Sequence, residues 1–166
     1  HLTDVDPPIG FWRSVGASVN GFLHESFMDE MAHAAGQDPL EFRLKLMRPA
    51  HAPSAACLDN VREMSGWTGQ TPDGVGRGVA FSYSFGTPVA QVIEVVDEDG
   101  SIRINKAWIA CDVGLALDPS IIEAQMFGAL MYGLSAACFG ASLLAGTAIL
   151  SCFAGMRAVA PRCVMH

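Results

Sequence analysis

A glycine-bounded loop near the start of the chain carries the first side chain suited to ligand chemistry. The loop runs from Gly10 to Gly16 and holds Arg13 directly after Phe11 and Trp12. Glycine lets the backbone approach a bound group closely. The loop also leads into a predicted helix, and the free N–H groups of a helix N-terminus favour anions. The sequence therefore predicts a binding segment here, with Arg13 as its charged donor.

A second candidate segment begins at Cys111-Asp112-Val113-Gly114 and continues to Gln125 on a predicted helix. On that helix Gln125 shares a face with Ile121, Gly128 and Tyr132. An amide on an otherwise buried helix costs roughly 1–3 kcal/mol unless it finds a hydrogen-bond partner. Neighbouring backbone could satisfy the amide, but Gly128 leaves room beside it. That room favours a ligand as the partner of Gln125.

Two further motifs resemble a metal site and a phosphate loop, but both lack the required spacing. The first is a set of carboxylates and imidazoles on one predicted helix: His24, Glu25, Asp29 and His33. No H-E-x-x-H pattern is present, so we expect these residues to form the solvated face of the helix. The second motif, Gly74–Gly78, has neither G-x-G-x-x-G spacing nor a preceding strand, and is predicted to be a flexible turn.

The cysteines indicate neither a zinc site nor a disulfide framework. Their number is odd and no C-x-x-C pair occurs among Cys57, Cys111, Cys138, Cys152 and Cys163. Buried free thiols are the simplest interpretation. A catalytic cysteine would need a histidine beside it in space, which the sequence leaves open.

Two helices are predicted before residue 50. From about Asn20, apolar side chains recur every four residues and predict one buried face, with a C-cap at Gly36: Leu23, Phe27, Met31 and Ala35. The second helix opens with Asp38 as N-cap, Pro39 in the first turn and Glu41 reaching back. Its predicted apolar face comprises Leu40, Leu44 and Met47. A third short helix is expected over about 55–65.

The period changes to two after Gly66, which predicts strands. Alternation over 79–85 predicts the first strand, and two more are expected over 88–96 and 101–111. The acidic turn of residues 97–100 should join the last two as an antiparallel hairpin. Asp118-Pro119 then begins a helix that should run to about Ser135. The predicted fold class is α+β, with N-terminal helices, an antiparallel hairpin-based sheet and a buried C-terminal helix.

Composition limits the classes of protein that fit. The chain has 166 residues, 51% of them hydrophobic, and a net charge of −7, which excludes intrinsic disorder and suits one domain or part of a larger one. Its ten Lys and Arg residues are scattered singly, so no nucleic-acid partner is expected. The chain opens at His1 without a signal-like leader, and we expect it to be the interior of something longer. The compartment stays open between cytoplasm and periplasm.

A long uncharged run occupies 124–156, which is 33 positions. Its length and lack of charge reach the threshold for a membrane span. It nevertheless contains five glycines and several polar side chains, and it continues a well-capped helix. We therefore favour a buried helix followed by a core strand, and regard contact with a membrane as the weaker alternative.

The two candidate segments, in this order, resemble the molybdenum-cofactor-binding large subunit of the xanthine dehydrogenase/aldehyde oxidase family, and in particular the large subunits of the isoquinoline 1-oxidoreductase (beta) type. The similarity extends over about residues 8–137 with consistent spacing. The matching segments are Trp12–Gly16, Glu25–Glu30, Ala32–Gly36, Asp38–Arg43, Gly78–Ala80, Val89–Val92, Asp112–Gly114 and Gln125-x-x-Gly128.

The resemblance implies an activity. Members of that family hydroxylate N-heterocyclic aromatics or aldehydes with water as the oxygen source. Their molybdenum is held by a pterin, in bacteria usually as molybdopterin cytosine dinucleotide, and their electrons leave through a small partner subunit or domain with iron–sulfur clusters. The cofactor carries the redox work, and the protein positions it and sets the electrostatics.

The resemblance also implies roles for individual residues. Arg13 and Ser14 would lie beside the molybdenum centre, and Gln125 would hydrogen-bond the cofactor, with Gly128 giving room for the pterin. Val15 would form an aliphatic wall of the substrate pocket. No metal ligand is expected among the residues of this chain.

The chain departs from the family pattern in three places. The family's general base is a glutamate near the C-terminus of the large subunit, and no acidic residue follows Glu123 here. No catalytic residue is therefore assigned, and the chain alone is expected to be inactive. A glycine-rich G-Q segment is also missing; in the isoquinoline-type branch it would lie upstream of His1. We expect 1–137 to be part of a molybdopterin-binding domain and 138–166 to be an apolar, poorly matching tail that is truncated or aberrant.

Two other functions compete with this assignment. The glycine-rich loops would also suit a non-catalytic α+β domain that binds or assembles with a partner protein. The uncharged run would suit a membrane-tethered protein anchored by 124–156.

Overall fold

The computed structural model describes residues 8, 10, 13–98, 100–139 and 162–165. In chain order these form α1 (Gly16–Ala34), α2 (Pro39–Ala50), α3 (Ala52–Ser65), β1 (Val75–Ser84), β2 (Thr87–Glu98), β3 (Ser101–Cys111), α4 (Pro119–Phe139) and β4 (Arg162–Met165). The α+β class is confirmed. Asp99, Cys152 and residues 140–156 of the uncharged run lie outside the described part.

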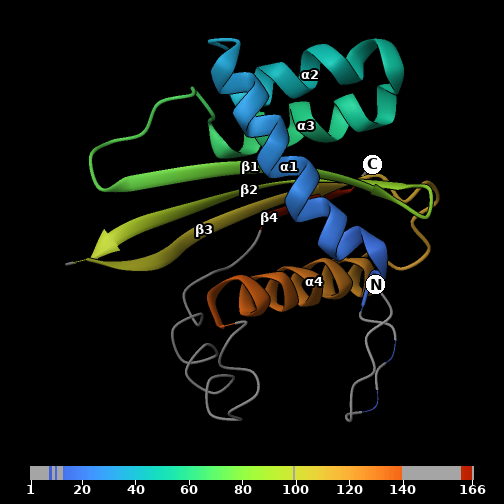
Figure 1. Cartoon of the computed structure of the whole chain (residues 1–166). Coiled ribbons are helices and arrows are strands. Elements are labelled where there is room, and N and C mark those ends of the chain that lie inside the picture. The colour runs from blue at the N-terminus through green and yellow to red at the C-terminus, as the bar shows by residue number, and fades with distance from the viewer. Residues whose placement is uncertain (1–7, 9, 11–12, 99, 140–161, 166) are drawn as a thin grey trace.

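One sheet separates two helical layers, with strand order β1-β2-β3-β4. The first three strands are antiparallel neighbours, and β4 pairs with β3 in parallel. Figure 1 shows α2 and α3 on one face of the sheet and α4 on the other. Helix α1 crosses between the layers: its first turn lies near α4 and its last near α2. Alternate side chains of β2 therefore face different helices.

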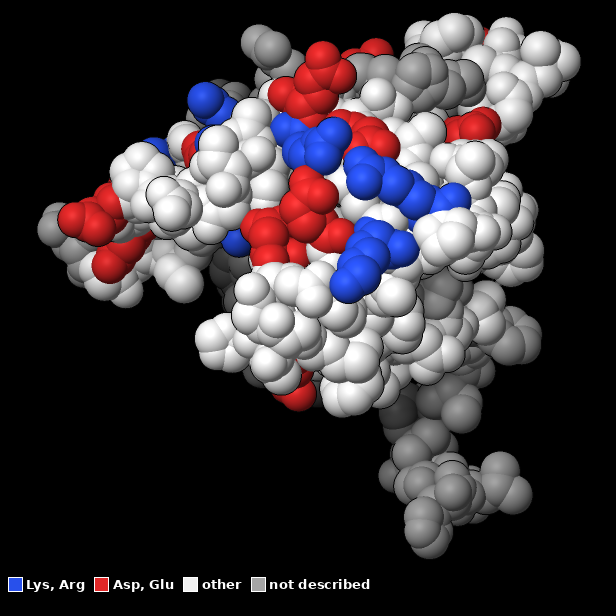
Figure 2. Space-filling model, turned by 90° about the horizontal axis from the view of Figure 1, so that it is seen from above, with Lys and Arg blue, Asp and Glu red and all other residues white. Residues whose placement is uncertain are grey.

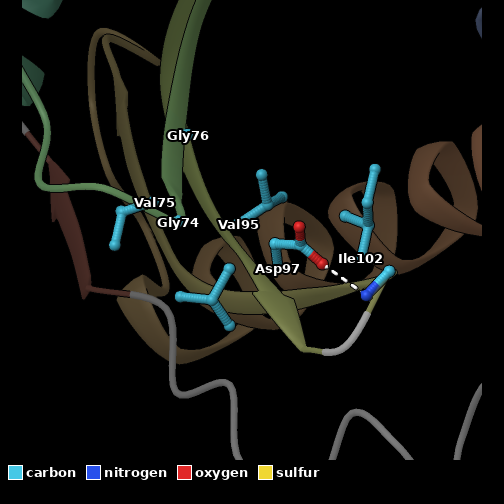
Figure 3. A pocket seen from close by; sticks show the side chains of 8 residues that line it. Gly74, Val75, Gly76, Val95, Asp97 and Ile102 are labelled. Carbon is cyan, nitrogen blue, oxygen red and sulfur yellow. Dashed lines mark hydrogen bonds between the residues drawn. The ribbon is translucent and has the colours of Figure 1, made fainter.

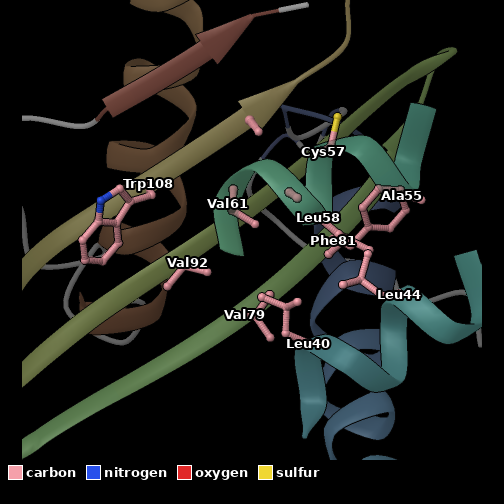
Figure 4. Packing of buried hydrophobic residues seen from close by; sticks show 12 residues of the cluster. Leu40, Leu44, Ala55, Cys57, Leu58, Val61, Val79, Phe81, Val92 and Trp108 are labelled. Atoms are coloured by element: carbon pink, nitrogen blue, oxygen red, sulfur yellow. The ribbon is translucent and has the colours of Figure 1, made fainter. Parts of the chain in front are cut away.

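The larger core lies between the sheet and α2 and α3 (Figure 4). Leu40 and Leu44 of the predicted apolar face are fully buried, and Met47 packs against this cluster. Alternation on the strands places Val79 and Val92 on the same side. The periodicity of α2 and the position of α3 were thus predicted correctly.

A smaller core lies under α4, where Leu130 and Leu134 pack against Ala107 and Ile109 of β3. The prediction that this helix is buried was wrong in extent. Ile121 and Phe127 are exposed, so α4 buries one side only. Among the described residues no other helix lies on this face of the sheet to cover the outer side of α4.

The strands begin and end close to the predicted bounds, with one difference. We expected Gly74–Gly78 to be a turn, but Gly76 and Gly78 lie within β1. Gly76 is opposite Val95, where a Cβ would come within 3.1 Å of a Val95 methyl carbon. Glycine here lets the strand pair closely rather than breaking it.

A β-bulge in β3 and a buried ion pair stabilise the sheet on the α3 side. The register shifts after Glu94, so Asn105 is the additional residue, and its amide donates to the Glu94 carboxylate at 2.5 Å. Arg77 Nε donates to the same carboxylate at 2.7 Å. Burial raises the pKa of Glu94, but these hydrogen bonds outweigh burial, so its pKa lies below the ordinary value.

Charges on the helical face alternate in sign rather than gathering by sign (Figure 2). Arg62 accounts for part of this pattern, since it pairs with Glu41 and Asp59, each at 2.9 Å. Such exposed pairs contribute only a few tenths of a kcal/mol each, roughly. This face therefore offers no patch of one charge to an ionic partner.

Candidate functional site

The structure brings the two candidate segments into direct contact. Arg13 Nη2 donates a hydrogen bond to Gln125 Oε1 at 3.1 Å, although the two residues are 112 positions apart. Arg13 Nη1 lies 3.8 Å from the position that a Cβ on Gly128 would take. The guanidinium carbon is 5.9 Å from the centre of the Tyr132 ring, within the range of a cation–π contact. One cationic side chain therefore lies along the face of α4 that the sequence singled out.

The backbone before α1 is strained, and side chains hold it. Ser14 and Val15 have φ of 65° and 50°, in the left-handed region that residues with a Cβ rarely adopt. The carbonyl oxygen of Arg13 accepts hydrogen bonds from the Ser14 hydroxyl at 2.6 Å and the Ser18 hydroxyl at 2.8 Å. The two hydroxyls also contact each other. Strain of this kind is typical of ligand-contacting segments, because the surrounding structure must impose it.

Helix α4 positions Gln125 through a well-formed N-cap. Asp118 Oδ1 accepts from the Ser120 N–H at 3.0 Å, the Ser120 hydroxyl at 2.6 Å and the Ile121 N–H at 3.2 Å. The hydrogen bond from the Ser120 hydroxyl, and to a smaller extent the one from the Ile121 N–H, holds the pKa of Asp118 below its ordinary value. The predicted cap is thus confirmed, and it fixes the start of the helix two turns before Gln125.

The space beside Gly128 differs from what we expected. From the sequence, the missing side chain of Gly128 is expected to leave room next to Gln125 for a ligand. Instead the Arg13 guanidinium occupies that place and contacts Gln125 directly. Gln125 is also exposed rather than buried on the helix. Its partner in the structure is neither neighbouring backbone nor an enclosed cavity, but the arginine of the other segment.

Two hollows among the described residues lie away from the Arg13–Gln125 contact. The first, of about 430 Å³, is lined by the start of β1 and the β2–β3 hairpin, including Gly74, Val95 and Ile102 (Figure 3). In Figure 1 this hairpin lies at the opposite end of the sheet from the start of α1. The second hollow, of about 140 Å³, lies beside Trp67 and Pro39. Neither includes Arg13 or Gln125 in its lining.

Val15, the expected wall of the substrate pocket, is half exposed at the start of α1, and Ser14 is exposed beside it. The predicted roles of both residues stay predictions. Trp12, the neighbour of Arg13, lies outside the described residues.

The predicted solvated face of α1 is confirmed for His24, Asp29 and His33, which are exposed, but was wrong for Glu25. We expected Glu25 to be solvated and Leu23 and Phe27 to be buried, yet Glu25 is buried and the two apolar side chains are 61% and 56% exposed. The cause is Arg43, which is 1% exposed and donates to Glu25 Oε2 at 2.8 Å. Within the described residues no group of three or more His, Cys, Asp or Glu side chains is placed to hold a metal ion.

The described cysteines have different environments. Cys57 and Cys111 are buried, as expected for structural thiols, whereas Cys138 is exposed. Burial, reinforced by the nearby Asp112 carboxylate, raises the pKa of the Cys57 thiol to about 11. A thiol with this pKa is protonated at neutral pH, which argues against a nucleophilic role for Cys57.

Comparison with known proteins identifies the family. Residues 25–147 match the family model of the molybdopterin cofactor-binding domain. The chain is 33% identical to the beta subunit of isoquinoline 1-oxidoreductase of Brevundimonas diminuta over 132 residues, which are 76% of this chain and 17% of that protein. The chain therefore belongs to the molybdenum-cofactor-binding subunits of the xanthine dehydrogenase family, which confirms the resemblance of the sequence motifs.

Two other relatives extend the comparison. One subunit of the nicotinate dehydrogenase of Pseudomonas putida is 29% identical over 158 residues, covering 81% of this chain and 13% of that protein. A membrane-bound aldehyde dehydrogenase of Gluconacetobacter polyoxogenes, named for pyrroloquinoline quinone, is 32% identical over 152 residues, covering 78% of this chain and 19% of that protein. The chain thus spans less than a fifth of the length of each relative.

Residues Pro119–Cys138 of α4 are long and apolar enough to cross a membrane. A helix that packs on the core of a folded domain can have the same length and composition. Here the segment lies inside the family match and packs Leu130 and Leu134 on the sheet. These contacts favour a role within the domain.

Proposed function

We propose that this chain is a segment of the large subunit of a molybdenum hydroxylase, and that Arg13, Ser14, Gln125 and Gly128 contact its cofactor. The Arg13–Gln125 hydrogen bond supports this proposal most directly, because it joins the two motifs on which the resemblance rests. Family membership supports the class of cofactor, a molybdopterin.

The side chains at this contact have the chemistry that a pterin cofactor requires. Arg13 uses one N–H on Gln125 and keeps other donors of its fixed fork. Because Gln125 accepts that bond through Oε1, its NH₂ group is left to donate, and among the described residues no hydrogen bond uses it. Cationic and amide donors match the oxygen and ring-nitrogen acceptors of a pterin and the charge of its phosphate. The residues therefore fit the group.

The finer assignments follow from the family. When bound, the cofactor supplies the two-electron redox chemistry of hydroxylation. We propose the cytosine dinucleotide form, an N-heterocyclic aromatic or an aldehyde as substrate, and a small iron–sulfur subunit as the electron acceptor. The names of the relatives, for isoquinoline, nicotinate and aldehyde, support these substrate classes. Within this scheme the chain orients the cofactor, and Val15 contributes an aliphatic wall.

The general base would be a glutamate outside these residues, and we expect the 166-residue chain alone neither to retain molybdenum nor to turn over. Residues 1–137 would then be part of the cofactor domain and 138–166 the divergent tail. Molybdenum analysis of the purified chain tests this expectation, and a stoichiometric metal content would overturn it.

The decisive experiment is Gln125→Ala in a complete large subunit that contains this chain, produced with its cofactor. We expect most of the molybdenum to be lost while the midpoint of thermal unfolding stays within a few degrees, because the exposed amide contributes little to folding. Gln37→Ala, also exposed but remote from the contact, is the matched control. Full retention of molybdenum by Gln125→Ala would refute the cofactor role.

The outward apolar side of α1 supports a second candidate, a domain that assembles with other protein without catalysis. Phe22, Leu23 and Phe27 are all more than half exposed, which is unusual for adjacent turns of one helix. Molybdenum analysis of the complete large subunit distinguishes the cofactor-binding domain from the assembly domain. A subunit that never contains molybdenum favours the assembly domain.

A further inference from the structure

A buried ion pair ties α1 to two other elements. The Glu25 carboxylate oxygen Oε2 accepts from Arg43 Nε of α2 at 2.8 Å and from the Phe81 N–H of β1 at 2.8 Å. Arg43 Nη2 also donates to the Glu25 carbonyl oxygen at 2.9 Å. One residue of α1 therefore contacts α2 through both its side chain and its backbone, and contacts the sheet as well.

The arginine of this pair is held in one orientation. Its Nη1 donates to the Asp29 carboxylate at 2.7 Å and to the Pro39 carbonyl oxygen at 3.0 Å, and its side chain is 1% exposed. Guanidinium donors lie in a rigid plane. Because a buried charge is costly to leave unpaired, α1 cannot slide or rotate on α2 without a large penalty. Apolar packing alone would tolerate such shifts more easily.

Few apolar side chains of α1 are buried. Met28 and Ala32 are its buried hydrophobic side chains. Phe22, Leu23 and Phe27 are each more than half exposed. Met28 and Ala32 lie in the second half of the helix, beyond Glu25. The first half, which carries the Arg13 loop, is positioned mainly from Glu25.

We propose that Glu25 and Arg43 are positioning residues for the cofactor contact, acting through the rigid body of α1 to place Arg13 on Gln125; this inference rests on the proposed function. Gly16 lies nine residues before Glu25, which is roughly 13 Å along an α-helix. A tilt of about 10° at Glu25 would move Gly16 by roughly 2 Å. That displacement is enough to break a hydrogen bond of 3.1 Å.

Hydrogen exchange on the 166-residue chain tests the positioning directly. Glu25→Gln keeps an acceptor for Phe81 but removes the charge that pairs with Arg43. We expect exchange of the hydrogen-bonded amides of α1, from its second turn onward, to accelerate roughly tenfold or more, because the helix detaches more often, with exchange in β2 and β3 unchanged. Glu30→Gln makes the same chemical change on an exposed position of the same helix, and should leave exchange unaltered. Unchanged exchange in α1, or an equal acceleration in the strands, would overturn the proposal.

A milder variant covers the case in which Glu25→Gln does not fold. Asp29→Asn removes only the negative charge of the outer partner of Arg43, and the Asp29 side chain is 52% exposed. It should accelerate exchange in α1 several-fold without affecting β2 and β3. Uniform acceleration, or none, would again contradict positioning by this pair.

The link to the cofactor is tested by a double-mutant cycle in the complete large subunit, with molybdenum content as the readout. If Glu25 acts through Arg13, then Glu25→Gln together with Arg13→Ala should lose no more molybdenum than Arg13→Ala alone. If the double variant instead loses molybdenum by the product of the two single losses, the inference is overturned. If Arg13→Ala and Gln125→Ala both retain molybdenum, the proposed function fails, whereas the exchange experiment still decides whether Glu25 positions α1.

Discussion

The Arg13 guanidinium and the Gly128 backbone are neighbours, with Nη1 3.8 Å from where a Cβ on Gly128 would lie. Arg13 therefore lies against the helix at Gly128 and simultaneously donates to Gln125. The motif Gln125-x-x-Gly128 thus also has a structural meaning within this chain: the amide accepts a hydrogen bond from Arg13, and the arginine packs beside the glycine.

Substitutions at Gly128 should separate these effects. Gly128→Ala places its methyl group at an ordinary contact distance from Arg13, and alanine is favoured over glycine in a helix by up to about 1 kcal/mol. We expect a slightly raised midpoint of thermal unfolding and an intact Arg13–Gln125 contact. Gly128→Leu should displace Arg13, detected as a changed NMR resonance of its Nε–H. An unchanged Arg13 resonance in the leucine variant would contradict the geometry.

Acid should destabilise the protein through Glu94. Its pKa is lower in the folded protein than in the unfolded chain, so its contribution is fully present above the unfolded value, near 4.5, and is lost as pH falls through the folded value. Glu94→Gln should cost roughly 3 kcal/mol at pH 7 and flatten the dependence of unfolding free energy on pH below 5. Glu98→Gln, on the same strand but exposed, is the control. Equal pH profiles for Glu94→Gln and the parent chain would contradict this prediction.

Thiol labelling should distinguish the described cysteines. With its pKa raised to about 11, the Cys57 thiol has little thiolate at pH 8, and it is also buried. Brief iodoacetamide treatment of the native protein, followed by peptide mass spectrometry, should modify Cys138 and leave Cys57 and Cys111 intact. In denaturant all three should react. Rapid native labelling of Cys57 would show that this core is open.

The cap of α2 should contribute measurably to stability. Asp38 Oδ1 accepts from the Leu40 N–H at 2.9 Å and the Glu41 N–H at 3.0 Å, and Oδ2 accepts from Trp67 Nε1 at 2.9 Å. Asp38→Ala should therefore cost about 2 kcal/mol, above the typical loss of a cap, and should shift the Trp67 fluorescence. Asp73→Ala, an exposed turn position, should change neither.

Local sequence rules predicted the elements whose determinants are local. The cap at Asp38, the apolar face of Leu40 and Leu44, and the hairpin after Glu98 depend on residues within one or two turns of each other. These parts of the fold were predicted from the sequence. The fold class needed no more than the change of hydrophobic period after Gly66.

The orientation of α1 could not be predicted in the same way. Periodicity showed two faces, and the apolar one was expected to be buried. The structure instead buries Glu25 together with Met28 and Ala32. Glu25 is buried because it pairs with Arg43, 18 residues away, and with the Phe81 N–H, 56 residues away. No pattern within α1 encodes those partners. The sequence likewise identified Gln125 and Gly128, but could not show that Arg13 itself fills the space between them.

The partnership between Glu25 and Phe81 has a consequence for solubility. Strand β1 lies at the edge of the described sheet, and an edge strand offers unpaired donors on which a strand of another molecule can add. The Phe81 N–H already donates to the Glu25 carboxylate, so an incoming strand would find this donor occupied. The same side chain that orients α1 thereby makes this edge of the sheet a poorer template for a strand of another molecule, and so disfavours aggregation by edge-to-edge pairing.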